Sequence, residues 1–140
     1  MNRLDIQFLD EGFHRVLFDA MPLPIFVVDG NINIFDCNRA ASHLIGKHRR
    51  FIIRRRGGDV LNCVNAARPS SGCGRQPACR DCMVRQSVTA AAHGRRVARQ
   101  WAQMELIRRG KVTKVKVRVS CQPFVYGKRS FILLVLEGLN

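Results

Sequence analysis

The sequence predicts an α+β fold in which a five-stranded antiparallel sheet carries helices on one face. Two short apolar segments near the N-terminal end flank a turn signal, and three alternating segments separated by tight turns fill the C-terminal third. Hairpin-type connections imply antiparallel pairing of these strands. Segments with helical periodicity lie between the two groups of strands, and 140 residues suffice for one buried core.

The first 21 residues are expected to form an amphipathic helix ahead of a domain spanning 22–140. Apolar side chains recur there at helical spacing: Leu9, Phe13, Val16, Leu17 and Ala20. Pro22 and Pro24 end this helix because proline cannot continue the hydrogen-bond ladder. The apolar stripe makes the helix a candidate surface for homodimerisation.

A strand hairpin and a capped helix are expected next. Residues 25–28 form a buried strand, a D-G-N signal marks the turn, and residues 32–37 form the partner strand. Asn38 is a favourable N-cap for a short helix over 39–45, which Gly46 closes.

The remaining chain combines an irregular middle with the last elements of the sheet. Residues 47–78 are rich in glycine, proline and polar side chains, and they overlap a cysteine-rich insertion over 57–82. A helix is expected from residue 78 to 93. Three strands then complete the sheet: residues 95–107, 111–124 and 130–137. Alternation in the middle strand places Val115, Val117, Val119 and Cys121 on the buried side and Lys114, Lys116 and Arg118 on the other.

The charge balance is strongly basic, with 24 Lys and Arg against 10 Asp and Glu and a net charge of +14. Basic residues concentrate in 47–56 and in 95–118. This distribution is compatible with nucleic acid, anionic lipid or an acidic partner, but a solvated basic face is the simpler interpretation. Nucleic-acid binding is not favoured, because no basic helix has a helix-turn-helix neighbour and aromatic residues make up only 7%.

The chain shows no targeting signal, membrane span or catalytic apparatus. Its first residues have mixed charge, and the longest aliphatic and aromatic run, 131–136, is far too short for a bilayer, so a cytoplasmic location is expected. Neither a phosphate loop, a nucleophile elbow nor paired carboxylates are recognisable, so we expect no enzyme activity. The histidines lie apart, His43 is at most a remote haem ligand, and a flavin motif is missing.

Four of the six cysteines form the most informative pattern, a C-x9-C-x5-C-x2-C spacing: Cys63, Cys73, Cys79 and Cys82. Four thiolates suit zinc or an iron–sulfur cluster, since both need converging soft anionic ligands. Gly72 and Gly74 allow a tight turn around Cys73, and a helix start at Cys79 would place it on one face with Cys82. We therefore predict that these four cysteines are metal ligands.

Other interpretations of the cysteines stay open. A cysteine is often a small buried hydrophobe, and a disulfide pair acting as a redox switch is a second alternative. A reducing cytoplasm favours metal ligation or redox chemistry over structural disulfides. The remaining two, Cys37 and Cys121, are expected to pack in the core because each falls in a strand.

Two sequence stretches carry a resemblance to a known family. The segment LFDAMPLPIFVVDGNINIFDCNRAASHLIG resembles the start of a PAS domain, and these positions match its pattern: Asp29, Gly30, Asn38, Ala40, Ala41, Leu44 and Gly46. The middle resembles a cysteine-bearing subset with G-D-x-L-x-C, then G-C-G, then C-x-x-C-x-x-R. Here those motifs occupy 58–63, 72–74 and 79–85.

The resemblance implies a PAS-like sheet and a role as a sensory or dimerising module. PAS domains are coupled to histidine kinases of two-component systems, nucleotide cyclases or transcription regulators. Since the family senses redox state and gases, iron–sulfur is slightly preferred to zinc. The predicted function is thus a redox or gas sensor that signals to an effector. A zinc-stabilised interaction module and a basic nucleic-acid-binding regulator are the alternatives.

Overall fold

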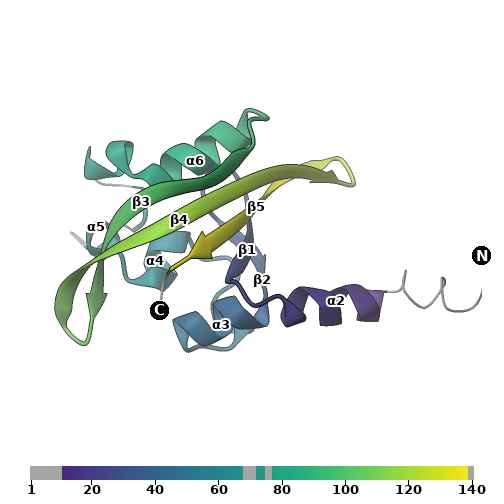
Figure 1. Cartoon of the computed structure of the whole chain (residues 1–140), viewed down its shortest axis with the longest axis horizontal. Coiled ribbons are helices and arrows are strands. Elements are labelled where there is room, and N and C mark those ends of the chain that lie inside the picture. The colour runs from purple at the N-terminus through teal and green to yellow at the C-terminus, as the bar shows by residue number, and fades with distance from the viewer. Residues whose placement is uncertain (1–10, 68–71, 75–76, 139–140) are drawn as a thin grey trace, which may run out of the picture.

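A computed structural model describes residues 11–67, 72–74 and 77–138, and it has the predicted α+β architecture. Five strands form one sheet in the order β2-β1-β5-β4-β3, and every neighbouring pair is antiparallel. The strands are β1 Ile25–Val28, β2 Ile34–Cys37, β3 Val97–Arg108, β4 Lys111–Tyr126 and β5 Arg129–Glu137. The short strands β2 and β1 thus lie at one side of the sheet, and the long β3–β4 hairpin lies at the other (Figure 1).

Seven helical segments accompany the sheet in the described residues: α2 Glu11–Ala20, α3 Arg39–Ile45, η1 Arg49–Phe51, α4 Gly57–Leu61, α5 Val64–Ala67, η2 Pro77–Asp81 and α6 Met83–Ala92. Helix α6 packs against β3, β4 and β5, whereas α2 projects away from the body of the domain (Figure 1). None of the helices in the described ranges combines the length and apolar character needed to cross a bilayer.

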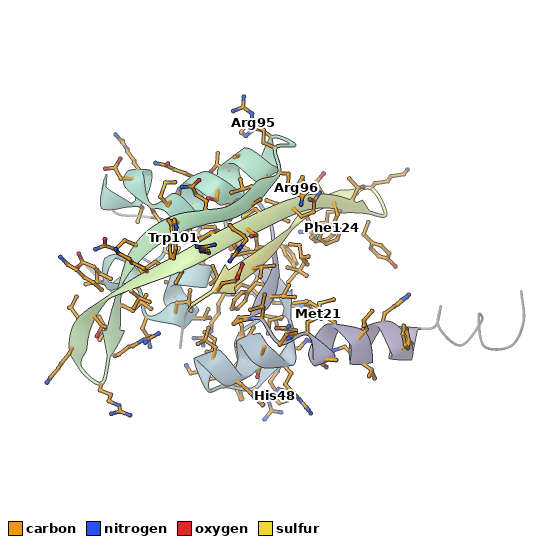
Figure 2. The ribbon with its side chains drawn as sticks, viewed as in Figure 1. Met21, His48, Arg95, Arg96, Trp101 and Phe124 are labelled. Atoms are coloured by element: carbon orange, nitrogen blue, oxygen red, sulfur yellow. The ribbon has the colours of Figure 1, made fainter. Side chains whose placement is uncertain are left out.

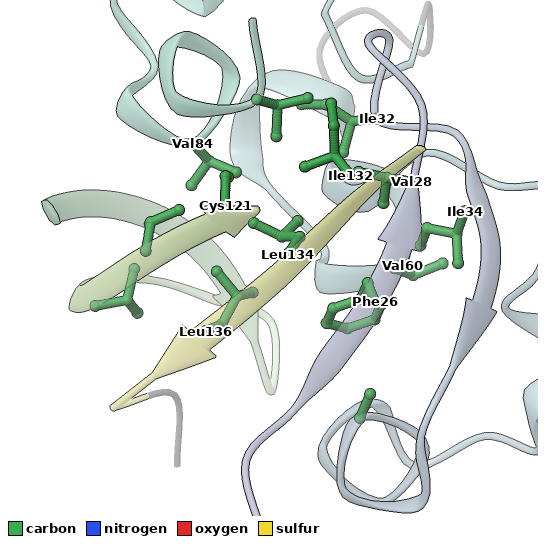
Figure 3. Close-up of a cluster of buried hydrophobic side chains, with 14 of the residues drawn as sticks. Phe26, Val28, Ile32, Ile34, Val60, Val84, Cys121, Ile132, Leu134 and Leu136 are labelled. Carbon is green, nitrogen blue, oxygen red and sulfur yellow. The ribbon is translucent and has the colours of Figure 1, made fainter. Parts of the chain in front are cut away.

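The core lies between the sheet and the helices that cover its inner face. As predicted, Val117, Val119 and Cys121 of β4 are buried, while Lys114 and Lys116 are exposed. Figure 3 shows the cluster, in which side chains of β1 and β5 meet Val60 of α4 and Val84 of α6: its labelled members are Phe26, Val28, Ile32, Ile34, Val60, Val84, Cys121, Ile132, Leu134 and Leu136.

Asn38 joins β1 to α3 and is completely buried. Its Oδ1 accepts hydrogen bonds from the backbone N–H of Ile25 and of Ala41, each at 3.0 Å, and its Nδ2 donates to the Leu23 carbonyl at 2.9 Å. Gly46 ends the helix in the left-handed conformation, at φ 77°. The predicted N-cap and C-cap are both confirmed.

Several predicted boundaries are wrong. Residues 47–78, expected to be irregular, contain the short helices η1, α4 and α5 in their described part. The helix expected over 78–93 is broken at Cys82, whose extended backbone (ψ 117°) separates the 3₁₀ turn η2 from α6. The second strand begins at Ile34, because Ile32 adopts φ 62°. The start of the N-terminal helix lies outside the described residues.

Helix α2 contacts the domain through its polar side, and its apolar stripe faces solvent. The Arg15 guanidinium donates to both carboxylate oxygens of Asp36, each at 3.0 Å, and to the Cys37 carbonyl at 3.1 Å. Val16 and Leu17 remain 67% and 47% exposed. The amphipathic pattern was predicted correctly, but the ion pairs rather than the apolar side chains dock this helix.

The side chain of Trp101, the one tryptophan of the chain, lies on β3 and is 55% exposed (Figure 2). The Arg118 guanidinium of the neighbouring strand lies 4.4 Å from its ring centroid, a cation–π contact that shields one face of the ring. Alternation therefore placed Trp101 on the outer face, together with the basic residues.

Replacing Asn38 with Ala should lower the free energy of unfolding by about 3 kcal/mol, because it removes a helix cap and leaves the buried Ile25 N–H without an acceptor. Urea denaturation followed by circular dichroism measures this. The matched control is Asn31→Ala at an exposed turn position, which should stay within about 0.5 kcal/mol of the wild type. Equal stability of the two variants would contradict the role of Asn38.

Candidate functional site

All four cysteines that the sequence singled out line one cavity beneath the inner face of the sheet. Cys63, Cys73, Cys79 and Cys82 share its wall with apolar side chains of β1, β3 and β5, including Phe26, Val28, Met104, Leu134 and Leu136. The cavity measures about 50 Å³, more than a single water molecule requires. Residues from three separate segments of the irregular middle therefore converge on one apolar chamber.

The loop that carries Cys73 is held at both of its backbone polar groups. The Asp59 carboxylate accepts a hydrogen bond from the Cys73 N–H at 3.0 Å, and the Arg56 guanidinium donates to the Cys73 carbonyl at 2.7 Å. Both bonds involve an ionised partner and are stronger than neutral ones. They fix the position of Cys73 relative to α4.

Glycines make the close approach of this loop possible. A Cβ on Gly58 would lie 2.9 Å from the Cys73 Sγ atom, closer than real side chains pack. Gly72 and Gly74 have φ of 93° and 86°, a region that disfavours residues with a Cβ. The G-D and G-C-G motifs therefore have a shared structural reason, which is the contact between α4 and the loop.

Arg85 completes the motif from the other side. A side chain on Gly74 would collide with the Arg85 guanidinium, and Arg85 lines the cavity together with the cysteines. Arg85 therefore brings a permanent positive charge to the same wall as the four cysteines. The three parts of the cysteine motif, which lie at 58–63, 72–74 and 79–85 in the sequence, are therefore close together in the fold.

The other cysteines sit at the ends of short elements. The Cys63 N–H donates to the Gly58 carbonyl at 2.8 Å, and Cys63 forms a bridge with Leu106 of β3. Cys79 lies in η2 and Cys82 is the N-cap residue of α6, so the predicted common helix face for this pair is wrong. Their positions instead follow from the turn between the two helices, where the Cys82 N–H donates to the Cys79 carbonyl at 3.3 Å.

Burial raises the thiol pKa of three cysteines, Cys73, Cys37 and Cys121. Desolvation raises the pKa of Cys73, a backbone hydrogen bond from Gly58 opposes this, and negative charge on Asp59, Cys63 and Cys82 raises it further. Desolvation also raises the pKa of Cys37 to about 11 and of Cys121 to about 12. Both of these are fully buried, which confirms the prediction that they pack in the core.

The donor set fits a soft metal ion or cluster in its chemistry. Four cysteines border one chamber, and thiolates are the soft ligands that zinc and iron–sulfur clusters prefer. Within residues 11–67, 72–74 and 77–138, however, no three His, Cys, Asp or Glu side chains stand in metal-ligand geometry. Ligation would need rotation of the cysteine side chains and loss of their protons.

Sequence reasoning missed the role of Arg56, whose partner is a carbonyl 17 positions further along the chain. Only a backbone group receives this hydrogen bond, so no residue type at the partner position signals it. The Asp59 carboxylate lies within the recognised motif, but its bond to the Cys73 N–H depends equally on the folded loop.

Comparisons with known proteins agree with this architecture. The sequence family described as PAS domain matches residues 12–78. No curated protein matches the chain. Among solved structures, the PAS domain of nitrogen regulation protein NR(II) from Vibrio parahaemolyticus is similar, with a TM-score of 0.60, 13% identity, and coverage of 89% of this chain and 96% of that one.

Two further structures are similar in the same way. A PAS domain from a two-component sensor histidine kinase has a TM-score of 0.58 at 10% identity, covering 96% of this chain and 98% of that one. A domain of the sensory box sensor histidine kinase/response regulator from Geobacter sulfurreducens has a TM-score of 0.53 at 14% identity, covering 91% and 97%. At these identities the likeness shows a PAS-like fold.

Replacing Asp59 with Ala should increase the alkylation rate of Cys73 several-fold. The substitution removes the acceptor that holds the Cys73 N–H, which loosens the loop and increases access to the thiol. It also removes a negative charge that raises the thiol pKa, which favours the reactive thiolate. Peptide mapping by mass spectrometry after timed iodoacetamide treatment measures the rate at Cys73. Asp81→Ala, at an exposed position of η2, changes the charge equally and should leave the rate unchanged; a similar increase in both variants would argue against the clamp.

Proposed function

We propose that this chain is a PAS-type sensor domain whose input site is the cysteine-lined cavity. The PAS family match over residues 12–78 and the PAS-like fold support the general assignment. The proposed input site rests on one observation: Cys63, Cys73, Cys79 and Cys82 line a single cavity under the sheet. A ligand or redox change there acts on the core side of the sheet.

In this proposal the four cysteines hold a thiolate-bound iron–sulfur cluster or a zinc ion. A cluster supplies one-electron chemistry and reactivity toward oxygen or nitric oxide, whereas zinc supplies structure alone. The residues of this chain have separate tasks. Arg56 and Asp59 position the Cys73 loop, and the positive charge of Arg85 offsets part of the thiolate charge.

The cavity is connected to both edges of the sheet. On one side the Ile107 N–H of β3 donates to the Asn62 carbonyl at 2.8 Å, directly before Cys63. On the other side Arg56, which holds the Cys73 loop, forms a bridge with Asn33 beside β2. A rearrangement of the loop therefore acts on both edge strands through backbone hydrogen bonds, and this is the proposed route of the signal.

The proposed output is a partner or effector domain of the histidine kinase type, together with a second copy of this chain. Two of the similar structures are named as parts of sensor histidine kinases. Helix α2 presents Val16 and Leu17 to solvent, and Arg15 is its only Lys or Arg, so it does not share the basic character of the chain. Pairing of two α2 stripes would bury these side chains without bringing the basic strands together.

A structural zinc module is the second candidate, because the same four sulfurs could serve it. In that case oxidants and reductants would leave the protein unchanged, and chelation would unfold the domain. The basic surface by itself favours neither candidate.

Protein purified without oxygen should contain about one zinc per chain, or iron with an equal amount of acid-labile sulfide and a visible absorption band. Elemental analysis and the visible spectrum distinguish these outcomes. Replacing any one of Cys63, Cys73, Cys79 or Cys82 with Ser should sharply lower the bound metal, since each supplies a ligand. The matched control, Cys37→Ala, removes a buried thiol outside the cavity and should retain the metal. Colourless wild-type protein without metal would refute the cysteine site.

Replacing Leu17 with Glu should raise the dissociation constant of the dimer by about tenfold or more, because a charge enters the surface proposed to be buried. Sedimentation equilibrium measures the constant. Val112→Glu changes a similarly exposed apolar side chain on the β3–β4 hairpin and should not affect assembly. A wild-type chain that stays monomeric at high concentration would contradict pairing through α2.

A further inference from the structure

We propose that a groove along the outer side of α6 binds a small ligand carrying a phosphoryl group. The groove measures about 620 Å³, and four of its lining residues are arginine or histidine: Arg80, Arg85, Arg95 and His93. Gln86, Thr89 and Ala90 complete its wall. None of these residues is acidic. This site is separate from the cysteine cavity, although Arg85 lines both.

Local hydrogen bonds give the groove its shape. The Gln86 side-chain amide donates to the Arg80 carbonyl at 3.0 Å and fixes η2 against α6. The Arg95 N–H donates to the Ala90 carbonyl at 3.0 Å, which folds the segment after the helix back along it. The His93 Nδ1 atom lies 2.8 Å from the Thr89 carbonyl, which orients the ring. Basic side chains from three consecutive segments are thereby brought to one side of the helix, and Arg95 lies at its end (Figure 2).

The charges in the groove are not balanced by the described part of the protein. Among the described residues, ion pairs are formed by Arg15, Arg49 and Arg99. None of these ion pairs includes an arginine of the groove. Three guanidinium groups around one hollow repel each other, so a bound oxyanion would relieve this repulsion. The planar guanidinium fork also matches the geometry of phosphoryl oxygens better than an ammonium does.

The dimensions favour a small ligand over an acidic protein. A volume of about 620 Å³ lies within the usual range for small-molecule sites, and the groove follows a helix of only 10 residues. A stable protein partner would need a much larger contact area. The diffuse basic strands of the sheet could attract an acidic protein without a groove, whereas several guanidinium groups around one hollow suit a compact polyanion.

Arg85 connects the groove to the cysteine cavity, and this connection rests on the proposed function. Its guanidinium lies over Gly74 in the Cys73 loop and also borders the groove. An oxyanion that engages Arg85 would change the charge beside the cysteines, and by linkage the state of the cysteines would change the affinity of the groove.

Isothermal titration calorimetry with inorganic pyrophosphate tests the groove. Wild-type protein at fixed ionic strength should show saturable binding at one site. The double variant Arg80→Gln/Arg95→Gln should bind at least about tenfold more weakly, because it loses two charge-assisted contacts. The control Lys114→Gln/Lys116→Gln removes the same charge from exposed positions of β4 and should retain the affinity. Circular dichroism verifies that each variant is folded.

Three results would overturn the proposal: no saturable binding, an equal loss of affinity in both double variants, or tighter binding of a hexaglutamate peptide than of pyrophosphate at the groove. The last result would assign the groove to an acidic protein segment. The quadruple Cys→Ser protein separates the two sites, because it should lose metal and still bind pyrophosphate. If the protein does not bind pyrophosphate, its metal content should be unaffected, so the two proposals can fail independently.

Discussion

Cys73 lies against the backbone of Gly58, and two ionised side chains hold the peptide groups on either side of it. This contact needs a residue without a Cβ at position 58, and it needs Arg56 and Asp59 to turn toward the same short loop. The middle of the chain packs Ile52 and Val60 into the core, but the Cys73 loop itself offers no large apolar side chain. Charge-assisted hydrogen bonds to its backbone therefore position this loop.

The cavity is a consequence of that arrangement. The cysteine side chains, the loop and α4 together with the inner faces of β1 and β5 enclose a small space that no side chain fills. An apolar chamber with four thiols is costly to hydrate and favours the neutral form of Cys73. The proposed sensory role rests on a species that replaces a proton on one of these sulfurs, since such a species would avoid the cost of burying a thiolate.

Three parts of the molecular surface differ in chemical character: the outer face of the long strands, the exposed stripe of α2 and the groove along α6. Lysines and arginines occupy the outer face of the long strands, where Arg118 also covers Trp101. Helix α2 is docked by Arg15 and Asp36 and leaves its apolar stripe outside. The α6 groove concentrates arginines without a described carboxylate partner. The pairing through α2 and the anion binding at the α6 groove that are proposed above therefore involve different surfaces of the molecule.

Local sequence patterns determined the strands, the α3 helix and its caps. Alternation along β4 and the Asn38–Gly46 pair were sufficient, since each depends on residues a few positions apart. The motif also selected the four cysteines that line the cavity, while Cys37 and Cys121 were correctly assigned to the core. The short helices α4 and α5, the break at Cys82, and the exposed side of α2 were decided only by tertiary structure. The environment of α4 and the docking of α2 depend on contacts between distant segments, Arg56 with the Cys73 carbonyl and Arg15 with Asp36. No local periodicity indicates a partner that far along the chain.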